Sequence, residues 1–212
     1  MKSTKSLFAI LALLLISTLA CSIGGGKSLD ILFEDDFSDT DSGWDRHSDD
    51  VGSMDYYDDQ YRIYVYETEY DIWATPFQDF GDVIVEVNTS KISGSDDNNF
   101  GIICKYVDTD RFYMLLISSD GYYAIQKMTV DGYERLSGEF FEESSAINLG
   151  NSENTLKAEC VGGRLALYVN GTLVGEVYDY DYTSGDVGLL AGSFSEANVE
   201  ILFDDFVVSK PE

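Results

Sequence analysis

The chain has 212 residues, with 39 acidic and 13 basic side chains and a formal net charge of −26 at pH 7. This charge argues against nucleic acid as a partner, because nucleic-acid binding needs a basic surface that neutralises phosphates. Aromatic residues make up 14% of the chain and there are only two prolines, a composition typical of one all-β domain of this length.

Residues 1–20 have the pattern of an export signal. Lys2 and Lys5 give a positive start, and residues 7–16 form an unbroken apolar run. A transmembrane helix needs roughly 20 apolar residues, so this run is too short to span a bilayer. The pattern therefore predicts a cleaved signal peptide.

The segment Thr18-Leu19-Ala20-Cys21 resembles the lipobox of bacterial lipoproteins. In that motif a small residue precedes a cysteine that is lipidated on sulfur and becomes the new N-terminus. Thr18 departs from the motif, since leucine is usual there, so cleavage by an ordinary signal peptidase is the alternative. The resemblance implies an extracytoplasmic protein that is anchored to a bacterial membrane through Cys21. Residues 21–29 are glycine-rich and are expected to be a flexible tether.

Residues 30–212 are predicted to form one antiparallel β-sandwich. Apolar and polar residues alternate with period two between segments rich in Gly, Asp, Asn and Ser, which predicts strands. The clearest strands lie at residues 60–66, 82–88, 111–118, 155–161 and 164–169. Asn170-Gly171 is a strong signal for a two-residue hairpin turn. Many strands at this spacing favour two packed sheets in a jelly roll, because one open sheet would expose an apolar face.

The two ends of this domain carry related motifs, residues 33–37 (FEDDF) and residues 203–206 (FDDF). We expect these segments to pair as neighbouring strands. Pairing would bring carboxylates together, and a bound cation would relieve their repulsion. Candidate ligands of one structural calcium are therefore Asp35, Asp36, Asp204 and Asp205. Solvated turn carboxylates are the alternative.

Three cysteines are present, and lipidation of Cys21 would leave Cys104 and Cys160 as an even pair. Export places them in an oxidising compartment, and strand alternation points both side chains into the core. A disulfide between them is predicted; two separately buried thiols are the alternative.

Five segments together resemble the concanavalin A-like (laminin G-like) jelly-roll domains of bacterial surface lipoproteins. They are residues 35–44 (DDFSDTDSGW), 100–127 (FGIICKYVDTDRFYMLLISSDGYYAIQK), 156–177 (LKAECVGGRLALYVNGTLVGEV), 185–194 (GDVGLLAGSF) and 203–208 (FDDFVV). The resemblance implies the same sandwich fold. Relatives of this fold include lectins, carbohydrate-binding modules, glucanases and protein-binding domains. The fold alone therefore does not determine the function.

Motifs for catalysis are missing from the sequence. Laminarinase-type glucanases carry Glu-x-Asp-x-x-Glu on one strand, whereas the comparable strand here offers only Glu86. The single histidine, His47, lies in a polar run and is expected to be solvated. These observations favour a binding module over an enzyme.

Aromatic side chains give the remaining indication of function, because sugar binding uses exposed rings beside polar groups. The candidate ligand-binding residues are Trp44, Trp73, Tyr64, Tyr66 and Arg62; core or cross-strand packing is the alternative for each. The sequence thus favours a noncatalytic module that binds carbohydrate. Two alternatives stay open, a glycoside hydrolase or lyase with dispersed carboxylates, and a protein-interaction or structural module of the cell envelope.

Overall fold

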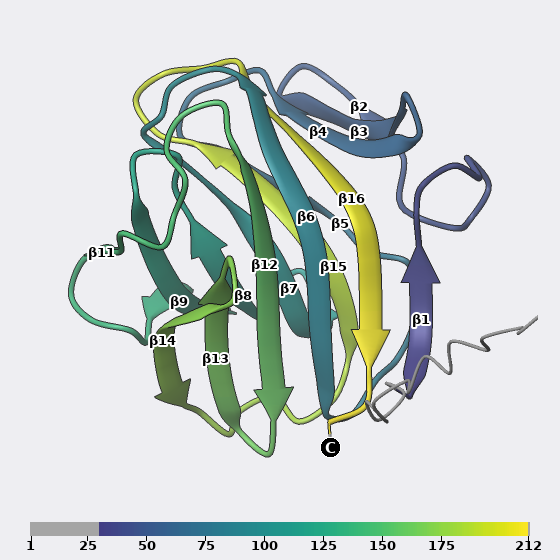
Figure 1. The fold of residues 1–212 in the computed structure, drawn as a ribbon, viewed down its shortest axis with the longest axis vertical. Helices are drawn as coiled ribbons and strands as arrows, with labels where there is room; N and C mark the ends of the chain where they lie inside the picture. Colours follow the sequence, from purple (N-terminus) through teal and green to yellow (C-terminus); the bar gives the residue numbers. More distant parts are fainter. Residues whose placement is uncertain (1–29, 212) are drawn as a thin grey trace, which may run out of the picture.

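The computed structural model describes residues 30–211, which form two antiparallel β-sheets packed face to face (Figure 1). From edge to edge, the nine-stranded sheet contains β14 (Thr172–Tyr178), β13 (Arg164–Val169), β12 (Glu153–Val161), β6 (Val83–Ser93), β16 (Val199–Ser209), β4 (Gln60–Val65), β3 (Gly52–Tyr57) and β2 (His47–Ser48), with β1 (Ile31–Asp35) also paired to β16. The seven-stranded sheet contains β10 (Gly132–Arg135), β9 (Tyr122–Thr129), β8 (Arg111–Ile117), β7 (Asn98–Asp108), β15 (Asp186–Ser193) and β5 (Asp71–Ala74), with β11 (Glu142–Glu143) paired to β9. The predicted antiparallel sandwich is confirmed.

Strand prediction from alternation agrees with the structure. The five clearest segments correspond to β4, β6, β8, β12 and β13. Asn170 and Gly171 both have positive φ and join β13 to β14, where Val169 pairs with Thr172. Within residues 30–211 there is no helix long and apolar enough to cross a membrane. The predicted signal peptide, Cys21 and the tether lie outside the described residues.

The core between the sheets follows from period-two alternation. On β4, for example, Tyr61, Ile63 and Val65 are fully buried, whereas Arg62 and Tyr64 lie on the outer face of the sheet. Each fully buried apolar side chain of this size contributes about 1.5–3 kcal/mol to the stability of the fold.

A disulfide joins the two sheets. Cys104 of β7 and Cys160 of β12 are both fully buried, and their Cα atoms are 6.7 Å apart. This bond confirms the pairing predicted from the cysteine count and from alternation. It lies in the half of β7 away from Asn98, where the strand begins.

The two ends of the domain pair as predicted (Figure 1). β1 runs antiparallel to β16, with Asp35 opposite Phe206. A register shift between Asp204 and Val207 marks a bulge in β16. Because of this bulge, Phe203 and Phe206 both face the core although they are three residues apart.

The outer face of the seven-stranded sheet carries a second apolar layer. It consists of Ile103, Phe112, Met114, Leu116 and Leu190, all almost completely buried, with Trp73, Tyr106 and Met128 packed against them. Sandwich sheets usually leave this face polar and solvated. Here Tyr133 of β10 and Asp71 of β5 line one pocket, so side chains of the two edge strands meet across the face. The seven-stranded sheet is therefore concave on its outer face.

Candidate functional site

The prediction that Trp44 binds ligand is wrong. Its side chain is 4% exposed and packs edge-on against Phe37 and Phe206. The indole Nε1 donates a hydrogen bond of 2.9 Å to Asp35. A ring enclosed in this way cannot stack on a sugar, so Trp44 is a core residue.

The predicted group of Arg62, Tyr64 and Tyr66 lies on the outer face of the nine-stranded sheet, as alternation indicated. The rings of Tyr64 and Tyr66 pack edge to face with centroids 4.8 Å apart, and the Tyr66 hydroxyl donates to Ser53 Oγ at 2.8 Å. The Arg62 guanidinium lies 4.4 Å from the Tyr57 ring centroid. None of these three residues lines the pocket described below.

Trp73 lies on the opposite side of the molecule, on the outer face of the seven-stranded sheet. It is half-buried against Phe112, with ring centroids 5.3 Å apart. The five predicted binding residues are therefore divided among the core and two outer faces. Of these five, only Trp73 lies on the face that carries the pocket described below.

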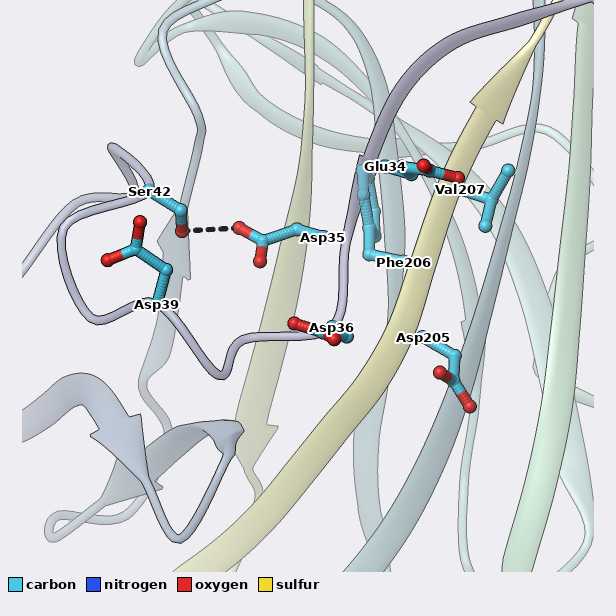
Figure 2. Close-up of a pocket in the computed structure, with 8 residues that line it drawn as sticks. All are labelled: Glu34, Asp35, Asp36, Asp39, Ser42, Asp205, Phe206 and Val207. Carbon is cyan, nitrogen blue, oxygen red and sulfur yellow. Dashed lines mark hydrogen bonds between the residues drawn. The ribbon is translucent and has the colours of Figure 1, made fainter.

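The four aspartates proposed as calcium ligands do not converge on one point. A pocket of about 530 Å³ lies beside β1, and Asp35, Asp36 and Asp205 are among its lining residues (Figure 2). The Asp35 carboxylate is directed towards Ser42, whereas the Asp205 carboxylate is directed away from both Asp35 and Ser42. Asp35 accepts hydrogen bonds from Phe37 N and Trp44 Nε1. Asp205 accepts one from Asn88, and Asp204 accepts one from Gln60. Residues 30–211 contain no group of three or more acidic, His or Cys side chains that could hold a metal. A structural calcium stays a prediction.

A different pocket, of about 500 Å³, opens on the outer face of the seven-stranded sheet, and we call it the sheet-face pocket. Its lining comes from β5, β7, β9, β10, the end of β15 and three loops, and consists of Glu69, Asp71, Asn99, Gln126, Tyr133, Arg135, Phe141, Ser193, Phe194 and Ser195. The volume falls within the range of small-molecule sites, about 300–1,000 Å³. Polar side chains and aromatic rings thus converge at one end of this sheet.

Strand register builds the floor of the sheet-face pocket. Gly192 of β15 pairs with Asp71 on one side and with Asn99 on the other. A Cβ atom at Gly192 would overlap Asp71 Oδ1 and Asn99 Oδ1. Because glycine stands there, the two side chains meet above it, and Asn99 Nδ2 donates to Asp71 Oδ1 at 3.0 Å.

Tyr133 and Asp71 form the polar bridge across this face. Burial raises the pKa of Asp71, and hydrogen bonds from Tyr133 and Asn99 oppose that shift. Burial and the neighbouring carboxylate of Asp71 raise the pKa of Tyr133. The Tyr133 hydroxyl therefore stays protonated at neutral pH beside the Asp71 carboxylate.

Two polar atoms in the pocket wall lack a hydrogen-bond partner. Arg135 stacks over Phe141 at 4.9 Å, and its Nη1 donates to the carbonyl of Glu139 at 2.8 Å. Its Nε is buried without a partner, and so is Oδ1 of Asn99, a residue only 4% exposed. Such atoms cost about 1–3 kcal/mol each when they stay unsatisfied. One of them is a donor and the other an acceptor.

Hydroxyl groups match the chemistry of these atoms, because a hydroxyl can donate to an acceptor such as Asn99 Oδ1 or accept from a donor such as Arg135 Nε. Gln126 and Ser193 add further donors and acceptors in the same wall. Phe141 and Phe194 form an edge-to-face pair with centroids 6.0 Å apart at the rim. The arrangement combines flat apolar rings with donors and acceptors for hydroxyl groups.

The sequence prediction missed every polar residue of the sheet-face pocket. One signal was available, since alternation places Asp71 on the same face as Trp73. No local pattern distinguishes Asn99, Gln126 or Arg135 from other polar residues, because their convergence depends on the register of distant strands.

Comparison with known proteins identifies the fold. No family model and no curated protein sequence matches the chain. A carbohydrate binding module, CBM66, from Bacillus subtilis is 14% identical with a TM-score of 0.64, over 79% of this chain and 96% of that chain. A protein of unknown function with a galectin-like fold from Bacillus subtilis gives the same identity and TM-score, over 85% and 96%.

A third similar structure is the GH43 BlXynB protein from Bacillus licheniformis, at 14% identity and a TM-score of 0.62. The match spans 84% of this chain but 39% of the BlXynB chain, so this chain corresponds to part of that longer protein. At these identities the likeness shows the shared β-sandwich fold alone.

Proposed function

We propose that this protein is a noncatalytic module that binds carbohydrate in the sheet-face pocket. The observation that carries the proposal is the pair of unpartnered buried atoms, Asn99 Oδ1 and Arg135 Nε, in the wall of one pocket. Sugar hydroxyl groups can donate to Asn99 Oδ1 and accept from Arg135 Nε, and the Phe141 ring in the same lining can pack against the apolar face of a pyranose. The fold shared with a carbohydrate binding module agrees with this function.

The proposal favours binding over hydrolysis for two reasons. The laminarinase-type Glu-x-Asp-x-x-Glu motif is missing from the sequence. Of the two carboxylates in the pocket lining, Glu69 and Asp71, Asp71 already accepts a hydrogen bond of 3.0 Å from Asn99 Nδ2.

Affinity gel electrophoresis tests this function. The full-length protein is run through gels that contain soluble neutral polysaccharides, namely xylan, mixed-linkage glucan, galactan, mannan and fructan. We expect retardation by at least one of them, and loss of that retardation in Asn99→Leu, which removes the acceptor without shortening the side chain. Unchanged mobility in every gel would contradict the proposal, and release of reducing sugar would assign hydrolysis instead.

We also propose that the module is displayed on a membrane through a lipid on Cys21. The apolar run at residues 7–16 and the small residue before Cys21 support this anchoring. Cys21→Ser should abolish lipid labelling and move the protein to the soluble fraction. A variant that is cut identically and stays with the membrane would contradict the anchor.

A further inference from the structure

We propose that the binding face has a second subsite next to the sheet-face pocket, and that the two together bind a neutral oligosaccharide chain across a ridge formed by Phe141 and Phe194. This inference rests on the proposed function and specifies its ligand. It assigns a chain of several sugar units to the face, where the sheet-face pocket alone would take a single sugar.

The geometric basis is a pocket of about 240 Å³ that shares a wall with the sheet-face pocket. Its lining consists of Asp97, Ser118, Asp120, Tyr122, Phe140, Phe141 and Phe194. Phe141 and Phe194 line both pockets. Their rings are nearly perpendicular, at 88°, with centroids 6.0 Å apart. The two pockets are therefore neighbours on either side of one aromatic ridge.

Strand order explains why the pockets are contiguous. Asn99 lies at the start of β7, and the residues that precede this strand include Asp97. Tyr122 begins β9, after the turn that carries Asp120. Both pockets are thus built at the same end of the seven-stranded sheet.

Exposed rings in the second pocket indicate an apolar contact with a ligand. Phe140 is 71% exposed and Tyr122 is 38% exposed. Large apolar rings that gather at a pocket rim mark a binding surface more often than singly scattered ones do. The C–H faces of sugar rings are flat and apolar, so they match such a surface.

The negative charge of the second pocket favours a neutral oligosaccharide over an acidic one. Asp97 and Asp120 supply acceptors for hydroxyl protons. Partial burial raises the pKa of Asp97, and the negative charges of Asp120 and Glu196 raise it further. A uronic acid or sulfated sugar would bring further negative charge to these carboxylates and be repelled. Hydroxyl groups can donate to the carboxylates without that penalty.

The test measures affinity against ligand length by calorimetry on the full-length protein. The probes are xylo-, cello-, manno- and fructo-oligosaccharides, each from the monosaccharide to the hexasaccharide, with oligogalacturonates as the acidic series. One double variant, Tyr122→Ala/Phe140→Ala, removes the exposed rings of the second pocket. Tyr178→Ala is the matched control, because Tyr178 is 61% exposed on β14 of the other sheet.

We expect the affinity of the native chain to rise by about tenfold or more from the disaccharide to the hexasaccharide in one neutral series. The double variant should lose this increment and keep the affinity for the shortest ligand, while Tyr178→Ala changes neither. Equal affinity at all lengths, an increment that survives in the double variant, or preference for oligogalacturonates would overturn the second subsite and leave the first intact. Failure of every series to bind would overturn the proposed function as well.

Discussion

The two outer faces of the sandwich differ in the partners of their polar groups and in whether those groups line a pocket. On the nine-stranded sheet, Tyr66 donates to Ser53, and Arg62 lies against the Tyr57 ring and 3.6 Å from Glu200. On the seven-stranded sheet, Asn99 and Arg135 line one pocket, and Asn99 Oδ1 and Arg135 Nε are buried without a hydrogen-bond partner. Arg62 Nε is also unpartnered, but Arg62 does not line the sheet-face pocket. Exposed tyrosines alone are thus a weaker sign of binding than unsatisfied polar atoms around a cavity.

Sheet curvature accounts for the difference. The seven-stranded sheet buries an apolar layer on its outer face, and side chains from its edge strands meet above that layer through Tyr133 and Asp71. The result is a hollow that is lined by polar side chains, with the rings of Phe141 and Phe194 at its rim. In the low dielectric of such a site, a hydrogen bond to a ligand is stronger than it would be on an open surface.

The largest expected effect concerns the disulfide, which lies away from the sheet-face pocket. The Cys104→Ala/Cys160→Ala variant frees a loop with a sequence separation of 56. The free energy of unfolding should fall by about 4 kcal/mol in the chain-entropy model, measured by chemical denaturation. Glycan affinity of the folded variant should stay unchanged. A comparable loss of affinity would show that the pocket and the disulfide are coupled.

Gly192→Ala should damage the pocket itself. The new Cβ would overlap Asp71 Oδ1 and Asn99 Oδ1, so the stability should fall by about 3 kcal/mol and glycan binding should be lost. The double variant Asp71→Ala/Gly192→Ala removes one clashing side chain. It should recover much of the stability and none of the binding. Normal binding by Gly192→Ala would show that the Asp71 and Asn99 side chains are not needed in this arrangement.

Arg135→Ala and Arg62→Ala compare the two faces directly. Arg135→Ala removes a charged donor from the pocket wall, and should weaken glycan binding by about 2 kcal/mol, roughly thirtyfold. Arg62→Ala removes the same type of side chain from the other face and should leave the Kd unchanged. The opposite pattern would place the site on the nine-stranded sheet.

The smallest expected effect comes from single hydroxyl groups. Tyr133→Phe removes the hydroxyl group beside Asp71, and should weaken binding by about 1 kcal/mol, roughly fivefold. Tyr66→Phe removes the hydrogen bond to Ser53 on the other face. Both variants should lose a similar small amount of stability, but calorimetry should show weaker binding only for Tyr133→Phe. Equal affinities would mean that the Tyr133 bridge does not shape the pocket.

Local sequence patterns predicted the strands, the sandwich and the Cys104–Cys160 bond, because alternation fixes which face each residue occupies. The same alternation placed Arg62, Tyr64 and Tyr66 on an outer face correctly. It could not place Trp44, which lies outside any strand and is drawn into the core by its hydrogen bond to Asp35.

The sheet-face pocket could not be predicted in this way. It depends on the pairing of β5 with β15 and of β15 with β7, which sets Asp71, Gly192 and Asn99 side by side. These residues are far apart in the sequence, and their register is fixed by the packing of the whole sandwich. Only the position of Asp71 and Trp73 on the same face of one strand could be predicted from local alternation.

The most direct test is a crystal structure of the full-length protein with the oligosaccharide that binds best in calorimetry. We predict electron density in the sheet-face pocket, with a sugar hydroxyl between Asn99 Oδ1 and Arg135 Nε and a ring against Phe141. Density at Tyr64 and Tyr66 on the nine-stranded sheet, with the sheet-face pocket empty, would contradict the account.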